Sequence, residues 1–251
     1  MMSRRLRVSI LISLGVFVVL TISAPAAQAG PPLICWPFDI GDAKSLPFGG
    51  DGWRAVSADY DLRRLPKDTL ALLGPSAPVI VRMETLRRAT VYVMKDRNAA
   101  GALLDRLQAR VRDAEAKGSP DALALFDAGY LAECYKQARG TWLPENFAAG
   151  LDGYAMIEKA IGLRGADGEM EFAAALASAG SSHQPELDAH LQRAVAGAIE
   201  GSLLAKNLVT HSQLFRVRAS TLADLRAQVG HAKPSPVCPK PGPRSSQPRQ
   251  N

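Results

Sequence analysis

Three side chains in the second half of the chain have the residue types and the spacing of a zinc site. His183 and Glu186 are three residues apart, and His190 follows four residues after Glu186, so all three share one face if a helix begins early enough. Zinc binds imidazole nitrogens and carboxylate oxygens, usually with a fourth ligand or a water molecule. The alternative is a solvated helix start, because Pro185 favours a first turn and the helix dipole stabilises an acid there. His183, Glu186 and His190 are therefore the candidate metal ligands of a chain that we otherwise expect to bind no metal or other cofactor.

A charged segment at residues 82–88 interrupts an otherwise apolar helical pattern. Glu84 is the candidate general acid or base of this segment, and Arg82 and Arg87 are candidates to line a ligand pocket beside it. The alternative is structural, because Glu84 and Arg88 are four residues apart and an ion pair at that spacing stabilises a helix. If Glu84 or Arg87 faces the interior, a buried ion pair that fixes the packing register is a further alternative. We prefer the structural interpretation and keep Glu84 as the catalytic candidate.

Aromatic side chains are frequent in residues 30–61, which are also rich in Pro, Gly and Asp and show neither a helical nor a strand period. This composition predicts an extended arm whose rings pack into grooves between helices, because aromatic side chains bury large areas. The alternative is a loop that grips a ligand. Trp36 and Trp53 are the candidate binding residues of such a loop.

The sequence shows no motif of nucleophilic or phosphate chemistry. It contains four histidines, but neither a G-x-S-x-G elbow, a C-x-x-C pair nor a Gly-rich phosphate loop. Nucleophilic catalysis needs a Ser or Cys beside a base, and no local pattern provides one. Catalysis is left open, and a non-catalytic protein is the preferred interpretation.

The three cysteines are spread over the chain. Cys134 falls within the apolar pattern of an expected helix, which predicts a buried free thiol. Cys35 and Cys238 lie in irregular segments near the two ends of the exported chain, where an oxidising compartment allows a disulfide between them. Connectivity cannot be read from sequence, so a Cys35–Cys238 disulfide is one alternative and free thiols are the other.

From residue 62 to residue 230 the hydrophobic pattern is helical nearly throughout. Apolar side chains recur at three- and four-residue steps, as at Leu103, Leu107 and Val111, which marks one buried face for each helix. Gly and Pro clusters separate these stretches, and short links favour antiparallel packing of neighbouring helices. We therefore predict an all-α domain of antiparallel helical hairpins, arranged as a bundle or a short solenoid, with very little strand.

The two ends of the chain differ in composition from this domain. Residues 1–29 combine arginines, an apolar run and the small-x-small site Ala27-Gln28-Ala29, which is the layout of a cleavable signal peptide. The apolar run is shorter than the ~20 residues of a permanent membrane helix, although a retained anchor is the alternative. We expect cleavage after Ala29 and a periplasmic or secreted product without an integral membrane segment. Residues 231–251 are rich in Pro, Lys, Ser and Gln, which predicts a disordered basic tail.

The formal net charge of +6 comes from those two ends, and residues 30–230 are close to neutral. Nucleic-acid binding relies on a basic face that contacts phosphates. We therefore expect no nucleic-acid partner.

Three segments resemble a family of secreted bacterial proteins. They are CWPFDIG at residues 35–41 with SLP at 45–47, RMETLRRAT at 82–90, and FDAGYLAE at 126–133. The similarity covers most of residues 30–230 and implies an exported all-helical protein. That family has no assigned activity, so the resemblance implies no functional residue. The stretch from Gly153 to Ala175 is also loosely similar to a tetratricopeptide hairpin, without a clean repeat of about 34 residues.

These patterns lead to two functional hypotheses. The first is an exported, non-catalytic protein of the cell envelope that uses helical hairpins to bind or scaffold a protein or peptide partner. The second is a hydrolase-type envelope enzyme with a cleft between the arm and the helix of residues 82–88.

Overall fold

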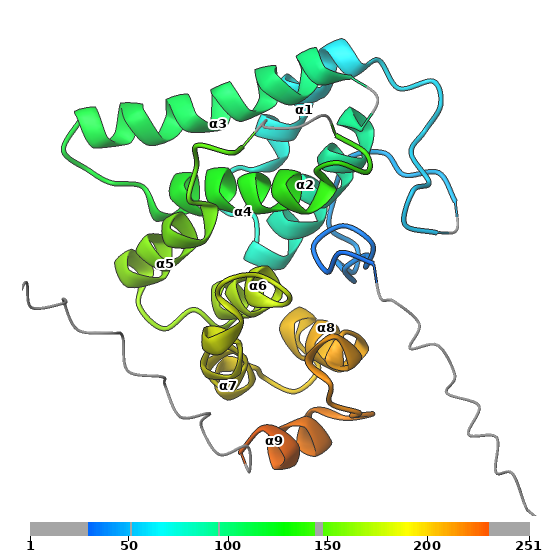
Figure 1. Cartoon of the computed structure of the whole chain (residues 1–251), viewed down its shortest axis with the longest axis vertical. Coiled ribbons are helices and arrows are strands. Elements are labelled where there is room, and N and C mark those ends of the chain that lie inside the picture. The colour runs from blue at the N-terminus through cyan, green and yellow to red at the C-terminus, as the bar shows by residue number, and fades with distance from the viewer. Residues whose placement is uncertain (1–29, 51, 95, 144–147, 231–251) are drawn as a thin grey trace, which may run out of the picture.

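A computed structural model describes residues 30–50, 52–94, 96–143 and 148–230, and these residues form an all-helical domain (Figure 1). No strand occurs within them, and their β-type pairings are two isolated bridges, Phe48 with Val56 and Arg139 with Leu143. The predicted all-α class is confirmed. The expected signal peptide at residues 1–29 and the expected tail at residues 231–251 lie outside the described residues.

Nine α-helices and three short 3-10 helices follow one another along the described chain. The α-helices are α1 (Leu65–Leu72), α2 (Val79–Val93), α3 (Arg97–Ala116), α4 (Ala122–Ala138), α5 (Gly153–Arg164), α6 (Gly168–Ser178), α7 (Leu187–Gly197), α8 (Leu203–Thr210) and α9 (Leu222–Gly230), and the 3-10 helices are η1 (Leu62–Arg64), η2 (Gln184–Glu186) and η3 (Ser212–Phe215).

Aspartate side chains begin four consecutive helices. Asp96, Asp121, Asp152 and Asp167 are the N-caps of α3 to α6, and each accepts a hydrogen bond from a backbone N–H of the first turn. Such a cap satisfies a donor that has no partner inside the helix and typically contributes ~1 kcal/mol. These helix starts are therefore fixed by local sequence.

Consecutive helices form hairpins, and the most extensive helix–helix contacts join α4 to α5 and α6 to α7. Glycines lie at the closest approaches. A Cβ atom on Gly129 of α4 would stand only 2.7 Å from the carbonyl oxygen of Gly153 on α5. A Cβ atom on Gly168 of α6 would stand 3.2 Å from the Cα of Gly197 on α7. Because glycine has no side chain, the backbones of the paired helices come into direct contact at these positions.

Three helices form the centre of the domain. In α2 every residue except Arg88 is buried, and α4 and α6 contain unbroken buried runs, from Ala124 to Tyr135 and from Met170 to Ser178. Outer helices such as α3 and α7 instead bury one face, as expected for amphipathic helices. The central helices are covered on all sides.

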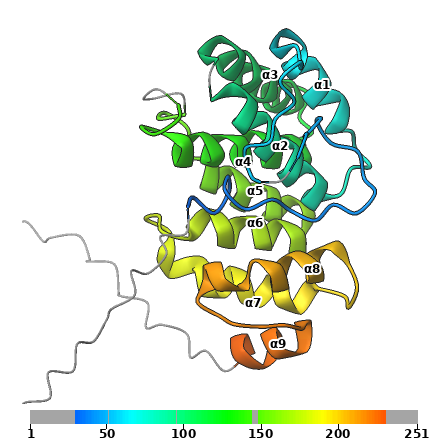
Figure 2. The same cartoon turned by 90° about the vertical axis from the view of Figure 1, so that its right-hand side faces the viewer.

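The segment before η1 runs across helices that are distant in sequence (Figure 2). The backbone N–H of Leu33 donates to Gln137 of α4, that of Phe38 to Glu84 of α2, and that of Asp39 to Asn207 of α8, at 2.9, 3.0 and 2.9 Å. Its buried hydrophobic side chains are mainly aliphatic, with Phe38 as the buried ring: Leu33, Ile34, Phe38, Ile40 and Leu46. The segment therefore joins the domain through backbone hydrogen bonds and aliphatic packing.

No helix of the described chain combines the length and the apolar composition that crossing a membrane requires.

Candidate functional site

Glu84, the catalytic candidate, lies beneath the N-terminal segment and is 1% exposed. Its Oε2 accepts hydrogen bonds from the Phe38 N–H at 3.0 Å and from Arg87 Nε at 2.7 Å. Its Oε1 accepts from Arg87 Nη2 at 2.8 Å and from Arg88 Nε at 2.7 Å. A general acid or base must reach the proton that it transfers, and both oxygens of Glu84 face donors of this chain.

The two arginines of this cluster also bind the N-terminal segment. Arg87 Nη1 donates to the carbonyl oxygens of Ile34 at 3.1 Å and Trp53 at 3.0 Å. Arg88 Nη1 donates to the carbonyl oxygen of Leu46 at 2.7 Å. The charged segment on α2 therefore acts as an anchor that holds the N-terminal segment on the helical domain at Ile34, Leu46 and Trp53. This arrangement favours the structural interpretation of Glu84 and Arg87.

Arg82, predicted to line the same pocket, belongs to a separate buried cluster. Its Nη1 donates to Asp127 Oδ2 at 2.7 Å, and its other nitrogens donate to the carbonyl oxygens of Ala77 and Gly74. Arg110 Nη1 reaches the same Asp127 oxygen at 3.2 Å, whereas Asp127 Oδ1 has no hydrogen-bond partner within the described residues. Burial of the carboxyl outweighs both guanidinium groups and raises the pKa of Asp127 to about 6.

The two candidate tryptophans are half-buried and have different neighbours. The Trp36 ring lies 6.3 Å from the His211 ring, between centroids, and its Nε1 has no partner within the described residues. The Trp53 ring packs edge-on against Trp142 at 5.1 Å, and the Arg54 guanidinium lies 4.4 Å above the Trp53 centroid. The Trp53 ring therefore already holds a cation of its own chain.

The histidines proposed as metal ligands meet at an aromatic ring. His183 stacks on Tyr154 with centroids 3.9 Å apart, and the Tyr154 hydroxyl lies 2.6 Å from His190 Nε2. Burial raises the pKa of Tyr154 to about 12, so the hydroxyl beside the imidazole stays protonated. Glu186 is exposed. No group of three or more metal-capable side chains is found among the residues described.

His190 takes part in a chain of hydrogen bonds across three helices. Its Nδ1 lies 2.6 Å from Glu171 Oε2 and 2.8 Å from Arg193 Nη2, and Arg193 Nε donates to Glu171 Oε1 at 2.6 Å. The sequence indicated His183, Glu186 and His190 as one set of metal ligands but did not indicate Tyr154, Glu171 and Arg193 as neighbours of His190. Tyr154 and Glu171 come from α5 and α6, so no local spacing reveals them, whereas Arg193 follows His190 by three residues on α7.

The cysteines described in the structure are free thiols. Cys134 is fully buried, as the sequence predicted, and burial raises the pKa of its thiol strongly. Cys35 is half-buried, and burial also raises its pKa. Cys238 lies outside the described residues, so the Cys35–Cys238 disulfide stays a prediction.

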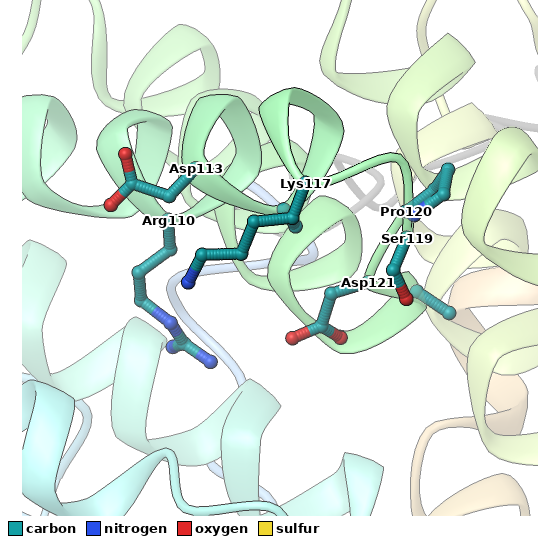
Figure 3. A pocket seen from close by; sticks show the side chains of 8 residues that line it. Arg110, Asp113, Lys117, Ser119, Pro120 and Asp121 are labelled. Atoms are coloured by element: carbon teal, nitrogen blue, oxygen red, sulfur yellow. The ribbon is translucent and has the colours of Figure 1, made fainter.

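The surface of the described chain has two cavities, the larger of which is lined in part by Arg110, the surface partner of Asp127. The larger, of about 620 Å³, is formed by the end of α3, the turn at residues 117–121 and the start of α4 (Figure 3). The smaller, of about 340 Å³, lies between the α5–α6 turn and the α7–α8 turn, and its lining includes Arg164, Asp167, Glu169 and Ile199. Sequence reasoning missed both cavities, because the smaller depends on how two separate turns meet and the larger on how α3 and α4 are placed around the turn that joins them.

The rim of the smaller cavity carries an exposed aliphatic side chain, that of Ile199. It is 75% exposed, and Leu163, one residue before the lining residue Arg164, is 48% exposed. They are the exposed large hydrophobic side chains of the described residues. Arg164 Nε pairs with Asp167 Oδ2 at 2.9 Å on the cavity wall. The cavity thus combines an uncovered aliphatic side chain with charged groups.

The chain matches no protein-family model, and comparisons with curated proteins and with solved structures find no similar protein.

Proposed function

We propose that this chain is an exported binding or scaffold protein of the bacterial cell envelope that holds a protein or peptide partner at the cavity of Ile199. The observation that carries the proposal is the 75% exposure of Ile199 at the rim of a cavity between two interhelical turns. Full burial of an aliphatic side chain of this size is worth about 1.5–3 kcal/mol. A partner that covers Ile199 gains part of that free energy.

The chemistry of the cavity suits an extended peptide with an apolar side chain. A volume of about 340 Å³ lies near the lower end of the range for small-ligand sites, roughly 300–1,000 Å³. The apolar side chain would pack beside Ile199. Arg164 uses Nε for Asp167 and Ser202 Oγ accepts from the Ala205 N–H, which leaves the other guanidinium N–H groups and the hydroxyl proton as donors to the peptide backbone. Binding sites typically combine an apolar lining with a small number of polar groups that fix the orientation of the ligand.

The buried charged clusters support a scaffold in preference to an enzyme. Glu84, Asp127 and Glu171 each bind at least one guanidinium group at 2.6–2.7 Å. These carboxylates connect elements of the fold, and removing one partner of a buried pair typically costs about 3–5 kcal/mol. Their positions fit a rigid helical framework.

Export is the second part of the proposal and depends on residues 1–29. N-terminal sequencing of protein recovered from the periplasm of an expressing bacterium tests it. A chain that begins at Gly30 supports export with cleavage after Ala29, and a chain that retains Met1 in the cytoplasmic fraction contradicts it.

Selection of displayed random peptides on the purified chain tests the binding site. Selected peptides should bind with saturable affinity, and Ile199→Ser should weaken them about tenfold, equivalent to about 1.4 kcal/mol. Leu163→Ser is the matched control, since it removes an exposed aliphatic side chain that does not line the cavity. Equal losses in both variants, or no peptide that binds the chain, would refute the proposed site.

A further inference from the structure

The larger cavity presents opposite charges on facing walls. Arg110 lies on α3 and Lys117 is the residue at its C-cap, and both side chains extend into the space of Figure 3. Asp121 projects from the start of α4 on the other side. The carboxylate of Asp113 points away from Asp121 in the same view. The two cations therefore face the Asp121 carboxylate across an open space, and Asp113 lines the cavity on their own side.

The cationic wall has hydrogen-bond donors to spare. Lys117 forms no ion pair or hydrogen bond through its side chain with any described residue. Arg110 uses Nη1 for the buried Asp127 at 3.2 Å, and that carboxylate is shared with Arg82 at 2.7 Å. One carboxylate thus serves two guanidinium groups, and Arg110, whose side chain is 32% exposed, keeps further N–H groups for a ligand.

The anionic wall also has a free acceptor. Asp121 Oδ1 caps α4 by accepting from the N–H groups of Leu123 and Ala124 at 2.8 and 3.2 Å. Asp121 Oδ2 has no hydrogen bond or ion pair with the residues described. The cap holds this carboxylate in place while one oxygen stays open to the cavity side.

We propose that this cavity binds a small zwitterion with an α-amino group and a carboxylate, either a free amino acid or a short peptide. The carboxylate pairs with Lys117 and Arg110, and the ammonium group pairs with Asp121 Oδ2. A simple anion would face repulsion from Asp121, and a simple cation would face repulsion from the two basic groups. A ligand that carries both charges avoids both costs. This site is separate from the cavity of Ile199 and does not depend on the proposed function.

Isothermal titration of the purified chain with L-alanine, dialanine and trialanine tests the proposal. N-acetylalanine lacks the ammonium group and alaninamide lacks the carboxylate, so each should bind at least about fivefold more weakly than alanine, equivalent to about 1 kcal/mol. Tighter binding of dialanine or trialanine assigns the site to peptides, and tighter binding of alanine assigns it to amino acids.

Two variants test the cationic side and the anionic side of the cavity separately. Lys117→Ala should weaken binding about fivefold, and Asp121→Asn should do the same while it preserves the helix cap, because Asn and Asp are equally good N-caps. Lys67→Ala, an exposed lysine of α1, is the matched control and should change nothing. The proposal is overturned if no ligand saturates the chain below about 50 mM, if the blocked compounds bind as well as alanine, or if Lys67→Ala matches Lys117→Ala.

Discussion

Arg87 and Glu84, one helical turn apart on α2, form a two-pronged ion pair that is closed off from solvent. Arg87 Nε lies 2.7 Å from Glu84 Oε2 and Nη2 lies 2.8 Å from Oε1, and the two side chains are 0% and 1% exposed. Only a guanidinium group offers parallel donors with this geometry. The pair directs the remaining nitrogen of Arg87 at the carbonyl oxygens of Ile34 and Trp53.

Arg87→Lys should loosen the N-terminal segment. An ammonium group cannot replace four hydrogen bonds with fixed directions, and it leaves buried acceptors without donors. We expect a loss of about 2–4 kcal/mol in the free energy of unfolding. Chemical denaturation measures the loss, and hydrogen exchange of the Phe38 amide, which donates to Glu84, should become faster.

Arg63→Lys is the control for this substitution. Arg63 pairs with Asp61 at 2.9 Å, but its side chain is 91% exposed. Its replacement should change stability by less than about 0.5 kcal/mol. Equal stabilities of the Arg87→Lys and Arg63→Lys variants would show that the Arg87 cluster does not anchor the segment.

The buried Asp127 should make stability depend on pH. Its pKa is raised from 3.8 to about 6 in the folded chain. Between these two pH values the folded state keeps a proton on Asp127 that the unfolded state releases. The resulting stabilisation is fully present below about pH 3.8 and is lost as the pH rises through about 6. At about 1.4 kcal/mol per pKa unit the full contribution is about 3 kcal/mol.

Urea denaturation between pH 4 and pH 7 measures this contribution, with Asp127→Asn as the reference because the amide does not titrate. The unfolding free energy of the wild type should fall relative to that of the variant as the pH rises through about 6. A difference that is constant over this range would contradict the raised pKa.

Gly129→Ala should push α4 and α5 apart. The added Cβ would lie 2.7 Å from the Gly153 carbonyl oxygen and 2.8 Å from the Met156 Cβ, and overpacking of this kind costs about 1–3 kcal/mol. Gly162→Ala on the exposed side of α5 is the matched control. A Cβ there meets nothing within 4 Å, so the substitution should increase the free energy of unfolding by about 0.5–1 kcal/mol. Melting temperatures that move in the same direction in both variants would argue against this packing.

The all-helical class and the hairpin arrangement could be predicted because periodic apolar residues and local breaks suffice for them. The outer helix α3 shows why, since its buried residues Leu103, Leu107 and Val111 form the stripe seen in the sequence. The central helix α2 shows the limit. Arg82, Glu84 and Arg87 are buried there. Spacing indicates the ion pairs of Glu84 within the helix, but it carries no information on the distant partners, which are Asp127 for Arg82 and the carbonyl oxygens of Ile34 and Trp53 for Arg87.

The candidate sites were harder to predict than the fold. The spacing of His183 and His190 indicated a metal, whereas both rings contact Tyr154 of another helix. Ile199 had no signal at all, because a single isoleucine near a turn looks the same in sequence whether it is covered or exposed. Exposure depends on tertiary packing, which the periodicity of one helix does not describe.

Hydrogen exchange of the chain with and without a selected peptide is the most direct test of the proposed binding site. We expect slower exchange at residues 164–169 and 197–204, which contain the lining of the Ile199 cavity, and unchanged exchange in α1. Protection that appears only elsewhere, or is the same in the Ile199→Ser variant, would contradict binding at this cavity.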